Sequence, residues 1–170
     1  MRTLKDKRVI ITGASSGIGL ELAKQLAAEG CRLVINARRK DRLEALAAKL
    51  SADGGNCIAV AGDVTDPIVR AKLLSAAKES FDGLDILINN AGVLQPRRFT
   101  DETLDNWNQT LAVNLTACFF LSQLVVPRMQ GSGGRIINLA SHSSLLGSTG
   151  RAAYAASKTG LVGFTRVLAV

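Results

Sequence analysis

The sequence predicts an α/β fold with a doubly wound parallel sheet. Short runs of Val, Ile and Leu alternate along the 170 residues with longer segments whose apolar residues recur at helical spacing. The short runs show no alternation of apolar and polar residues, which is typical of strands buried on both faces of a parallel sheet. Repeated strand–helix–strand units of this kind need right-handed crossovers, with helices on both faces of the sheet. No internal repeat or linker divides the sequence, so we expect residues 1–170 to form a single domain.

Five segments are predicted as strands because each is a short run rich in Val, Ile or Leu. They are Arg8–Thr12, Arg32–Asn36, Cys57–Ala61, Asp85–Ile88 and Arg135–Leu139. The longer segments between them are predicted as helices because their apolar residues recur at three- or four-residue steps. They are Gly17–Glu29, Lys40–Leu50, Asp66–Ser80 and Thr103–Met129, followed by a last helix that carries Tyr154 and Lys158. The run from Gly131 to Gly134 predicts a turn before the fifth strand.

The helix boundaries carry their own signals. Asp66 followed by Pro67 is typical of a helix start, because Asp caps free backbone N–H groups and Pro fits the first turn. Gly30 is typical of a helix end. Leu43 and Leu50 mark the apolar face of the second helix, which carries Lys and Glu on its other face.

The composition excludes several classes of protein. Hydrophobic residues make up 47% of the chain and charged residues 21%, which excludes a disordered or fibrous protein. The most apolar segment, Leu111–Val126, is interrupted by polar residues such as Asn114, so we expect no membrane span. The N-terminus lacks the apolar core of a secretory signal. Cys31, Cys57 and Cys118 are widely spaced and form no CxxC motif, so we expect reduced thiols, no metal site and a cytoplasmic protein.

The net charge of +7 raises the alternative of nucleic-acid binding. Residues 1–50 carry eleven Lys and Arg against five Asp and Glu, whereas residues 51–170 carry ten against nine. The excess is therefore local, and aromatic residues make up only 4% of the chain. A platform for stacking bases is hard to build from so few aromatic side chains, so we expect no nucleic-acid partner.

A glycine-rich turn between the first strand and the first helix predicts a dinucleotide-binding loop. Its sequence runs from Thr12 to Gly19 as TGASSGIG. Glycines spaced four and then two apart let the backbone turn sharply and approach a pyrophosphate, which is stabilised by the positive N-terminus of the helix. A tight turn without a ligand is the alternative interpretation of the glycines alone.

The end of the second strand bears on the choice of cofactor. Enzymes that bind NAD usually carry an acidic residue here, which holds the 2′-hydroxyl of the ribose. This sequence has Ala37 followed by Arg38 and Arg39 instead. An arginine suits a 2′-phosphate because its planar fork forms paired, charge-assisted hydrogen bonds. We therefore expect NADP(H) to be preferred, with NAD(H) as the alternative; a solvated, charged helix start is the other interpretation.

Further polar residues follow the later strands. Asp63 follows the third strand and Asn89-Asn90-Ala91-Gly92 follows the fourth, at the carboxyl ends where open α/β sheets bind ligands. Ser141 follows the fifth strand, and Tyr154 precedes Lys158 by four residues, which places both on one helix face. A free phenol is a poor acid or base at neutral pH unless nearby positive charge, such as that of a lysine, stabilises the phenolate.

Together these motifs resemble the short-chain dehydrogenase/reductase family. The resemblance rests on TGxxxGxG at 12–19, NNAG at 89–92, Asn114, Ser141 and YxxxK at 154–158, which occur in the family's order, and it extends from Lys7 onward. It implies a Rossmann-type NAD(P)-binding domain and an oxidoreductase that interconverts a carbonyl and a secondary alcohol by hydride transfer.

The resemblance also implies a role for each matching residue. Tyr154 would be the acid/base, Lys158 would bind the nicotinamide ribose and stabilise the phenolate, Ser141 would bind the substrate oxygen, and Asn114 would hold a water of the proton relay. The residues that would surround the pyrophosphate are Gly13, Ser15, Gly17, Ile18 and Gly19. Those that would contact the rest of the cofactor are Arg38 at the 2′-phosphate, Asp63 and Val64 at the adenine, and Asn90, Ala91 and Gly92, with Asn90 on the side of the adenosine ribose.

The sequence departs from the family pattern at its C-terminal end. Family members continue with a sixth strand and a substrate-binding segment, so the strand order 3-2-1-4-5-6 would stop at five strands, with the fifth at an exposed edge and the C-terminal part of the fold missing. We therefore keep a dinucleotide-binding fragment or remnant without turnover as the alternative function. Apolar residues on more than one face of the 103–129 segment predict a homodimer or homotetramer assembled through it.

Overall fold

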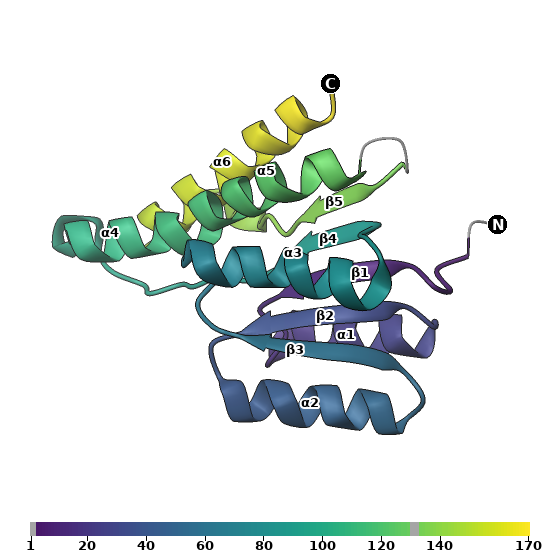
Figure 1. Ribbon diagram of the computed structural model, residues 1–170. Helices are drawn as coiled ribbons and strands as arrows, with labels where there is room; N and C mark the ends of the chain where they lie inside the picture. The colour runs from purple at the N-terminus through teal and green to yellow at the C-terminus, as the bar shows by residue number, and fades with distance from the viewer. Residues whose placement is uncertain (1–2, 130–132) are drawn as a thin grey trace. The chain divides into compact units, whose positions relative to one another are not determined.

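A five-stranded sheet is the framework of the fold. The computed structural model describes residues 3–129 and 133–170. Its strands are β1 (Arg8–Thr12), β2 (Arg32–Ala37), β3 (Asn56–Ala61), β4 (Ile86–Asn89) and β5 (Arg135–Asn138), in the order β3-β2-β1-β4-β5 (Figure 1). The pairs β1/β2, β1/β4 and β2/β3 are parallel, and Ile10 of β1 stands opposite Val34 of β2 and Leu87 of β4. The predicted doubly wound parallel fold and its strand order are thus confirmed.

The centre of the sheet is fully buried and its edges are not. Ile10, Leu33 and Ile35 have no exposed surface, as expected for strands covered on both faces. The prediction of full burial is wrong for the edge strands: β3 is half-buried along most of its length, and β5 alternates exposed and half-buried residues. An edge strand has one neighbouring strand instead of two, so less of its surface is covered.

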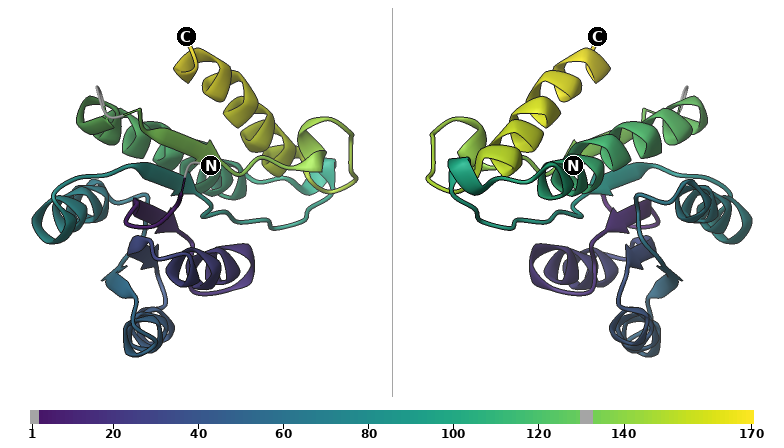
Figure 2. Two further views of the ribbon diagram at one scale, coloured as in Figure 1. Left: turned by 90° about the vertical axis from the view of Figure 1, so that its right-hand side faces the viewer. Right: turned by 90° about the vertical axis from the view of Figure 1, so that its left-hand side faces the viewer.

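The chain forms two compact units. Unit 1 comprises Met1–Ala91 and Leu121–Ile137, and unit 2 comprises Gly92–Phe120 and Asn138–Val170. In unit 1, helices α1 (Gly17–Ala28), α2 (Lys40–Ala52) and α3 (Pro67–Phe81) connect the first four strands. Figure 2 shows α1 and α3 on opposite faces of the sheet, as the doubly wound fold requires.

The predicted start and stop signals lie where they were expected. Asp66 caps α3, and its carboxylate accepts a hydrogen bond from the backbone N–H of Ile68 at 2.8 Å. Gly30 follows α1 with a φ of +79°, a conformation that suits glycine. Of the turn predicted from Gly131 to Gly134, residues 131–132 lie outside the described residues.

An ion pair joins the first strand to the fourth at their amino ends. The Arg8 guanidinium donates to both carboxylate oxygens of Asp85, from Nε at 2.8 Å and from Nη2 at 3.0 Å. The backbone N–H of Arg8 also donates to this carboxylate at 2.9 Å. The hydrogen bonds from Arg8 hold the pKa of Asp85 below its usual range, although partial burial opposes this. This pairing therefore stabilises the folded state above the pKa of an unfolded Asp, and is lost as the pH falls through the lowered value.

Unit 2 is mainly helical. It contains α4 (Leu104–Leu111), a π-helical turn (Ala112–Thr116), the beginning of α5 (Ala117–Met129) and α6 (Ala152–Leu168). The sequence predicted one helix over Thr103–Met129. The helical run is indeed continuous, and Thr103 caps it by accepting a hydrogen bond from Asn106 N at 3.2 Å, but the π-helical turn interrupts the regular α-helix around Asn114.

The run Leu104–Met129 passes a simple test for a membrane span. Its length and composition suffice, with a mean hydropathy of 1.6 over its most apolar window, 44% of which is buried inside the protein. Core helices pass the same test. The polar Ser122 on this run is fully buried and accepts a hydrogen bond from Asn89 Nδ2 at 3.2 Å, as is usual for a polar group in a protein core.

Candidate active site

The glycine-rich turn of unit 1 is shaped by two close backbone approaches. Gly13 has a φ of +71°, and a Cβ on it would lie 2.8 Å from the Cα of Ala91. A Cβ on Gly19 would lie 2.4 Å from Asn90 Nδ2 and 2.5 Å from the Gly13 carbonyl oxygen. By contrast, a Cβ on Gly17 would meet nothing within 4 Å. The turn is therefore closed on its inner side and open at Gly17, where α1 begins, as the predicted pyrophosphate site requires.

Thr12 and Asn90 connect this turn to the end of β4. The Thr12 hydroxyl accepts hydrogen bonds from the backbone N–H groups of Asn90 and Ala91, at 3.1 and 3.0 Å. The Asn90 side chain donates in return to the carbonyl oxygens of Thr12 and Gly13, at 2.8 and 3.2 Å. The predicted cofactor residues Gly13, Asn90 and Ala91 thus form one hydrogen-bonded cluster, which is secured by Thr12.

The two arginines after β2 differ in their contacts. Arg39 donates to the Ser15 hydroxyl at 3.0 Å and to the Ser16 hydroxyl at 2.6 Å, through its Nη2 atom. Arg38 is exposed and makes no side-chain hydrogen bond to the described residues. Ala37 is buried at the end of β2. Two guanidinium groups therefore lie at the carboxyl end of β2, one of them on the glycine-rich turn, and Arg39 was not among the predicted site residues.

The loop after β3 is held by its own side chains. The Asp63 carboxylate accepts from the backbone N–H and the hydroxyl of Thr65, at 2.9 and 2.8 Å. The buried Arg70 of α3 donates to the carbonyl oxygens of Val64 and Thr65, at 2.9 and 2.7 Å. The predicted adenine residues Asp63 and Val64 thus stand on a hydrogen-bonded loop, and one carboxylate oxygen of Asp63 is used within that loop.

Unit 2 brings Tyr154 and Lys158 together on α6. The Lys158 ammonium lies 5.9 Å from the centre of the Tyr154 ring, as the four-residue step predicts. Lys158 is 4% exposed and Tyr154 is half-buried. The ammonium donates to the Leu139 carbonyl oxygen at 2.6 Å, which fixes its position and leaves two of its three donors for other groups.

Burial affects the charge of Lys158. It lowers the pKa of the lysine, because removing an ammonium from water disfavours its charged form, and the electrostatic interaction with Cys118 opposes this shift in part. The Cys118 thiol is itself buried, which raises its pKa to about 11. Lys158 is therefore a buried cation beside a phenol, an arrangement that is more frequent at functional sites than elsewhere.

Asn114 lies in the π-helical turn, and all three polar bonds of its side chain are made within unit 2. It accepts from Val93 N at 2.8 Å and donates to Val93 O at 3.0 Å and to the Ser157 hydroxyl at 3.1 Å. Ser157 in turn donates to the Tyr154 carbonyl oxygen at 2.7 Å. The side chain of Asn114 is thus committed to structure, so the water that it is predicted to hold would have to be bound by another group of the turn, such as a backbone carbonyl.

Ser141 begins the short 3-10 turn His142–Ser144. Its hydroxyl accepts from the backbone N–H of Ser143 at 3.2 Å, which leaves the hydroxyl proton for another acceptor. The backbone N–H of Ser141 donates to Ser144 Oγ at 3.3 Å, and this second bond completes the cap. His142 is exposed on the same turn. Residues 3–129 and 133–170 contain no group of three or more His, Cys, Asp or Glu side chains that could hold a metal ion.

Comparison with known proteins decides the family. The family model for short chain dehydrogenases matches residues 7–170. This chain belongs to the short-chain dehydrogenase family. Among its relatives, a 3-oxoacyl-[acyl-carrier-protein] reductase of Synechocystis is 34% identical over 99% of this chain and 69% of the relative. A D-beta-hydroxybutyrate dehydrogenase of Cupriavidus necator is 38% identical over 98% of this chain and 65% of the relative.

Solved structures of the family share the fold. A short chain dehydrogenase from Burkholderia cenocepacia in complex with NADP superimposes with a TM-score of 0.92 at 38% identity, over 99% of this chain and 69% of the other. A short chain dehydrogenase/reductase from Burkholderia phymatum in complex with NAD gives 0.94 at 30% identity, over 99% of this chain and 60% of the other. This short-chain dehydrogenase chain therefore spans about two thirds of the length of the members that it matches.

Four residues important to this site were absent from the predicted set. Thr12 and Ser157 stand inside the TGxxxGxG and YxxxK motifs, so their place in these motifs could have identified them as site residues. Arg39 was noted beside Arg38, but its contact with the serines of the turn depends on folding. Arg70 had no sequence signal, because a charged residue in a helix is usually solvated.

Proposed function

We propose that the protein is an NADP(H)-dependent oxidoreductase that interconverts a carbonyl and a secondary alcohol. The observation that carries this proposal is the buried Lys158 ammonium, 5.9 Å from the Tyr154 ring, on the helix that Ser157 connects to Asn114. Family membership supports the same reaction. Residues 1–170 then act as one NAD(P)-binding domain.

The roles follow from the chemistry of each side chain. When bound, the nicotinamide cofactor supplies or accepts the hydride. The Tyr154 hydroxyl gives a proton to the substrate oxygen during reduction, and the positive charge of Lys158 stabilises the phenolate that remains. The Ser141 hydroxyl donates a hydrogen bond to the substrate oxygen and so positions it. A backbone carbonyl in the turn around Asn114 binds the water through which Tyr154 exchanges its proton with solvent.

The preference for NADP(H) over NAD(H) rests on the end of β2. Ala37 stands where an acidic residue would repel a 2′-phosphate. Arg38 is exposed, and its guanidinium forms no ion pair with a described carboxylate. Arg39 adds a second positive charge on the serines of the glycine-rich turn. Since relatives occur in complex with NADP and with NAD, this preference belongs to the local residues and not to the family.

The test combines cofactor titration with a Tyr154→Phe variant. NADPH and NADH are titrated by fluorescence, and reduction of a panel of ketones is followed by loss of NADPH absorbance. Tyr154→Phe should lower turnover by about 10²–10⁴, the usual contribution of a positioned acid or base, with little change in cofactor affinity. Lys158→Ala should weaken both. Undiminished turnover in Tyr154→Phe would exclude the acid/base role.

The alternative is a dinucleotide-binding module without turnover. NADPH binding of ordinary affinity, with no carbonyl reduction or alcohol oxidation over a broad panel, would favour it. The glycine-rich turn and the Thr12–Asn90 cluster belong to unit 1 and serve both functions equally well. Lys158 could serve a binding module by holding the ribose, but the Tyr154 hydroxyl has no role in binding alone, and for that reason we prefer the enzyme.

The partners that we propose are a small carbonyl or alcohol substrate and further copies of the chain. Phe119 and Phe120, on the first turn of α5, are 43% and 42% exposed and lie edge to face at 5.3 Å. Exposed aromatic rings next to each other are typical of protein interfaces. We infer a homodimer or homotetramer through this helix, in the cytoplasm, with neither a nucleic acid nor a membrane as partner.

A further inference from the structure

Two loops of unit 2 are joined by one backbone hydrogen bond. The N–H of Arg97 donates to the Gly150 carbonyl oxygen at 3.0 Å. Gly150 has a φ of +74°, and a Cβ on it would lie 3.3 Å from the Arg97 carbonyl oxygen. Any other L residue would be strained in this conformation and crowded against the neighbouring loop. The loop before α4 and the loop before α6 therefore meet at a place that requires glycine.

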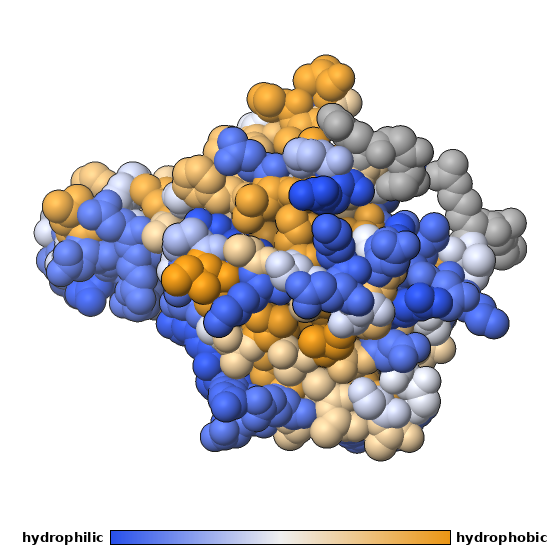
Figure 3. Space-filling model, viewed as in Figure 1, coloured by the Kyte–Doolittle hydropathy of each residue, from blue (hydrophilic) through white to orange (hydrophobic). Residues whose placement is uncertain are grey.

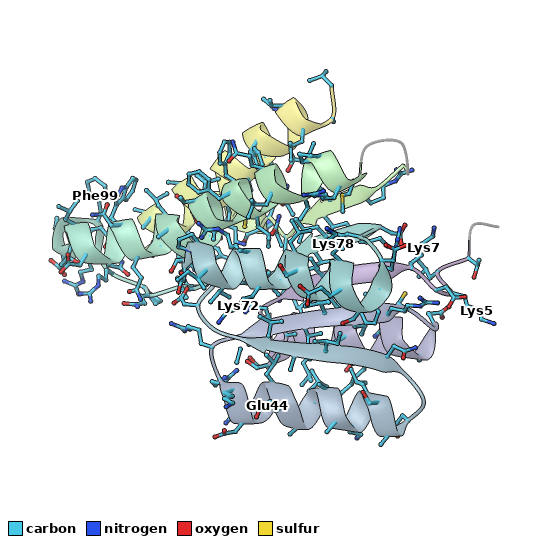
Figure 4. All side chains as sticks on the ribbon, viewed as in Figure 1. Lys5, Lys7, Glu44, Lys72, Lys78 and Phe99 are labelled. Carbon is cyan, nitrogen blue, oxygen red and sulfur yellow. The ribbon has the colours of Figure 1, made fainter. Side chains whose placement is uncertain are left out.

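Three arginines stand in sequence at this junction, Arg97 and Arg98 on the first loop and Arg151 next to Gly150 on the second. We call them the arginine cluster. Each side chain is exposed, and none forms an ion pair with a carboxylate within residues 3–129 and 133–170. Figure 4 labels Phe99, the residue that follows Arg98, and Figure 3 shows hydrophilic and hydrophobic residues mixed at that end of unit 2. The cluster thus presents positive charge that no described carboxylate neutralises through an ion pair.

The carboxylates that are closest in sequence are engaged with other groups. Asp101 Oδ1 accepts from the Thr100 hydroxyl at 3.1 Å. Glu102 Oε1 accepts from Asn106 Nδ2 at 2.6 Å and from Thr103 N at 3.1 Å. Glu102 therefore stabilises the start of α4, Asp101 bonds to its neighbour, and neither acid forms an ion pair with a described arginine. The charge of the arginine cluster remains available for a ligand.

One member of the arginine cluster, Arg151, stands three residues before Tyr154. Arg151 is the residue immediately before α6, and Tyr154 is in the first turn of that helix. Arg151 is the N-cap and Tyr154 the third residue of α6, two positions that face each other across the first turn of a helix. A substrate whose anionic group binds Arg151 could therefore place a carbonyl group, a few covalent bonds away in the same molecule, at the Tyr154 hydroxyl.

We propose that the arginine cluster binds the anionic group, a carboxylate or a phosphate, of the substrate that reacts at Tyr154. The planar guanidinium group matches both anions with paired, charge-assisted hydrogen bonds. That the bound molecule is a substrate rests on the proposed oxidoreductase reaction. Binding of the anion can be measured without turnover. The substrate class is then an oxo or hydroxy acid, or a phosphorylated ketone or alcohol, rather than a neutral compound.

Matched pairs of probes test the proposal by direct binding. The carboxylate pair is 4-oxopentanoate and its methyl ester; the phosphate pair is dihydroxyacetone phosphate and dihydroxyacetone. Dissociation constants are measured on the full chain by saturation-transfer NMR. In at least one pair the anion should bind about tenfold or more tightly than the neutral analogue, since charge-assisted hydrogen bonds are the strong ones. The pair with the larger ratio identifies the anion.

Variants assign the binding to the arginines. Arg97→Gln, Arg98→Gln and Arg151→Gln together should reduce the anion's affinity to that of the neutral analogue. Arg166→Gln is the matched control: it is exposed on the same helix, about 22 Å from Arg151 at 1.5 Å per residue, and should leave the ratio unchanged. If the triple variant does not fold, Arg151→Gln alone should lower the ratio, and 0.5 M KCl should lower it in the unmodified chain.

Three results overturn the proposal: equal affinities within both pairs, no measurable binding of either anion, or the same loss in Arg166→Gln as in the cluster variant. Reduction kinetics then separate this proposal from the proposed function. Anion binding through the arginine cluster without any reduction supports the site and contradicts the oxidoreductase. Reduction that depends on Tyr154, with equal binding of anionic and neutral compounds, supports the oxidoreductase and contradicts the anion site.

Discussion

Asn114 and Ser157 are joined by a hydrogen bond of 3.1 Å across 43 residues of sequence. Both side chains are fully buried. Because Ser157 also donates to the Tyr154 carbonyl oxygen at 2.7 Å, its single hydroxyl connects the π-helical turn to the first turn of α6. The hydroxyl both accepts and donates, so an apolar residue cannot replace it.

The first prediction is that Ser157→Ala destabilises the protein. Asn114 Nδ2 keeps its bond to Val93 but loses the bond to Ser157, and the free energy of unfolding should fall by about 1–3 kcal/mol, as for a buried polar group left partly unpaired. Urea unfolding measures the change. Thr159→Ala, which removes only an exposed bond of 3.4 Å to Ser144, is the control and should change stability little. Equal stabilities of the two variants would contradict the role of Ser157.

The second prediction compares two glycines of the same turn. Gly17→Ala meets no neighbour, so without cofactor it should cost about 1–2 kcal/mol, the penalty of a left-handed conformation. Gly19→Ala should cost more, because its Cβ would have to displace Asn90 and the Gly13 backbone. Urea unfolding of both variants in the absence of NADP(H) gives the comparison. A Gly19→Ala variant as stable as Gly17→Ala would refute the close approach.

The third prediction concerns cofactor choice. NADPH should bind more tightly than NADH, and Ala37→Asp with Arg38→Leu should reverse the order, because an acid repels the 2′-phosphate and binds the 2′-hydroxyl. Fluorescence titration with both cofactors measures the ratio. Arg42→Leu, an exposed arginine on α2, is the control for loss of positive charge. Equal affinities in the unmodified protein would leave Arg38 as a solvated charge.

The fourth prediction concerns pH. Burial raises the pKa of the Cys57 thiol to about 12, whereas an unfolded Cys titrates near ~8.5. The folded chain thus keeps a proton that the unfolded chain loses, so this stabilisation is complete below ~8.5 and is lost as the pH rises toward 12. Cys57→Ala should therefore lose less stability between pH 8 and pH 10 than the unmodified chain, in urea unfolding at each pH.

Ser75→Ala is the control for this measurement, since its side chain is exposed on α3. It should retain the pH dependence of the unmodified chain. Alkylation by iodoacetamide at pH 8 should also be slow at Cys57 and Cys118, because the thiolate is the reactive form. Fast labelling of both in the folded protein would show that their thiols are not held protonated.

The fifth prediction concerns assembly. Phe119→Asp with Phe120→Asp should shift the protein toward the monomer at micromolar concentration, because charges at the centre of an apolar interface lose their hydration. Light scattering measures the mass. Phe99→Asp, which alters an 84% exposed ring away from α5, is the control. A monomeric unmodified protein would contradict the proposed homo-oligomer.

Much of the fold was predictable because its signals are local. Every strand begins and ends within one residue of its predicted bounds, and Asp66 and Gly30 mark the helix boundaries that their chemistry favours. The π-helical turn at Ala112–Thr116 was not predictable from apolar spacing, because one extra residue in a helical turn hardly changes the periodicity. The half-buried edge strands were missed for another reason: burial depends on neighbours, and β3 and β5 have fewer of them.

The site was less predictable than the fold. The motifs indicate Tyr154, Lys158 and the glycine-rich turn, because their spacing is a property of the sequence. The bonds of Arg39 to Ser15 and of Arg70 to Val64 depend on where loops meet after folding. The arginine cluster has the same origin, since Arg97 and Arg151 are far apart in the sequence and adjoin through a glycine.

The Arg8–Asp85 ion pair lies at the amino ends of β1 and β4, whereas the glycine-rich turn and Asn90 follow the carboxyl ends of the same strands. A carboxylate that opposes unfolding in acid and the proposed nucleotide-binding turn thus lie at opposite ends of one pair of strands. A protein engineer could alter acid tolerance by changing Arg8 or its surroundings and leave the ligand contacts untouched. Natural variation at the amino ends would likewise adapt the protein to a new pH without a new specificity.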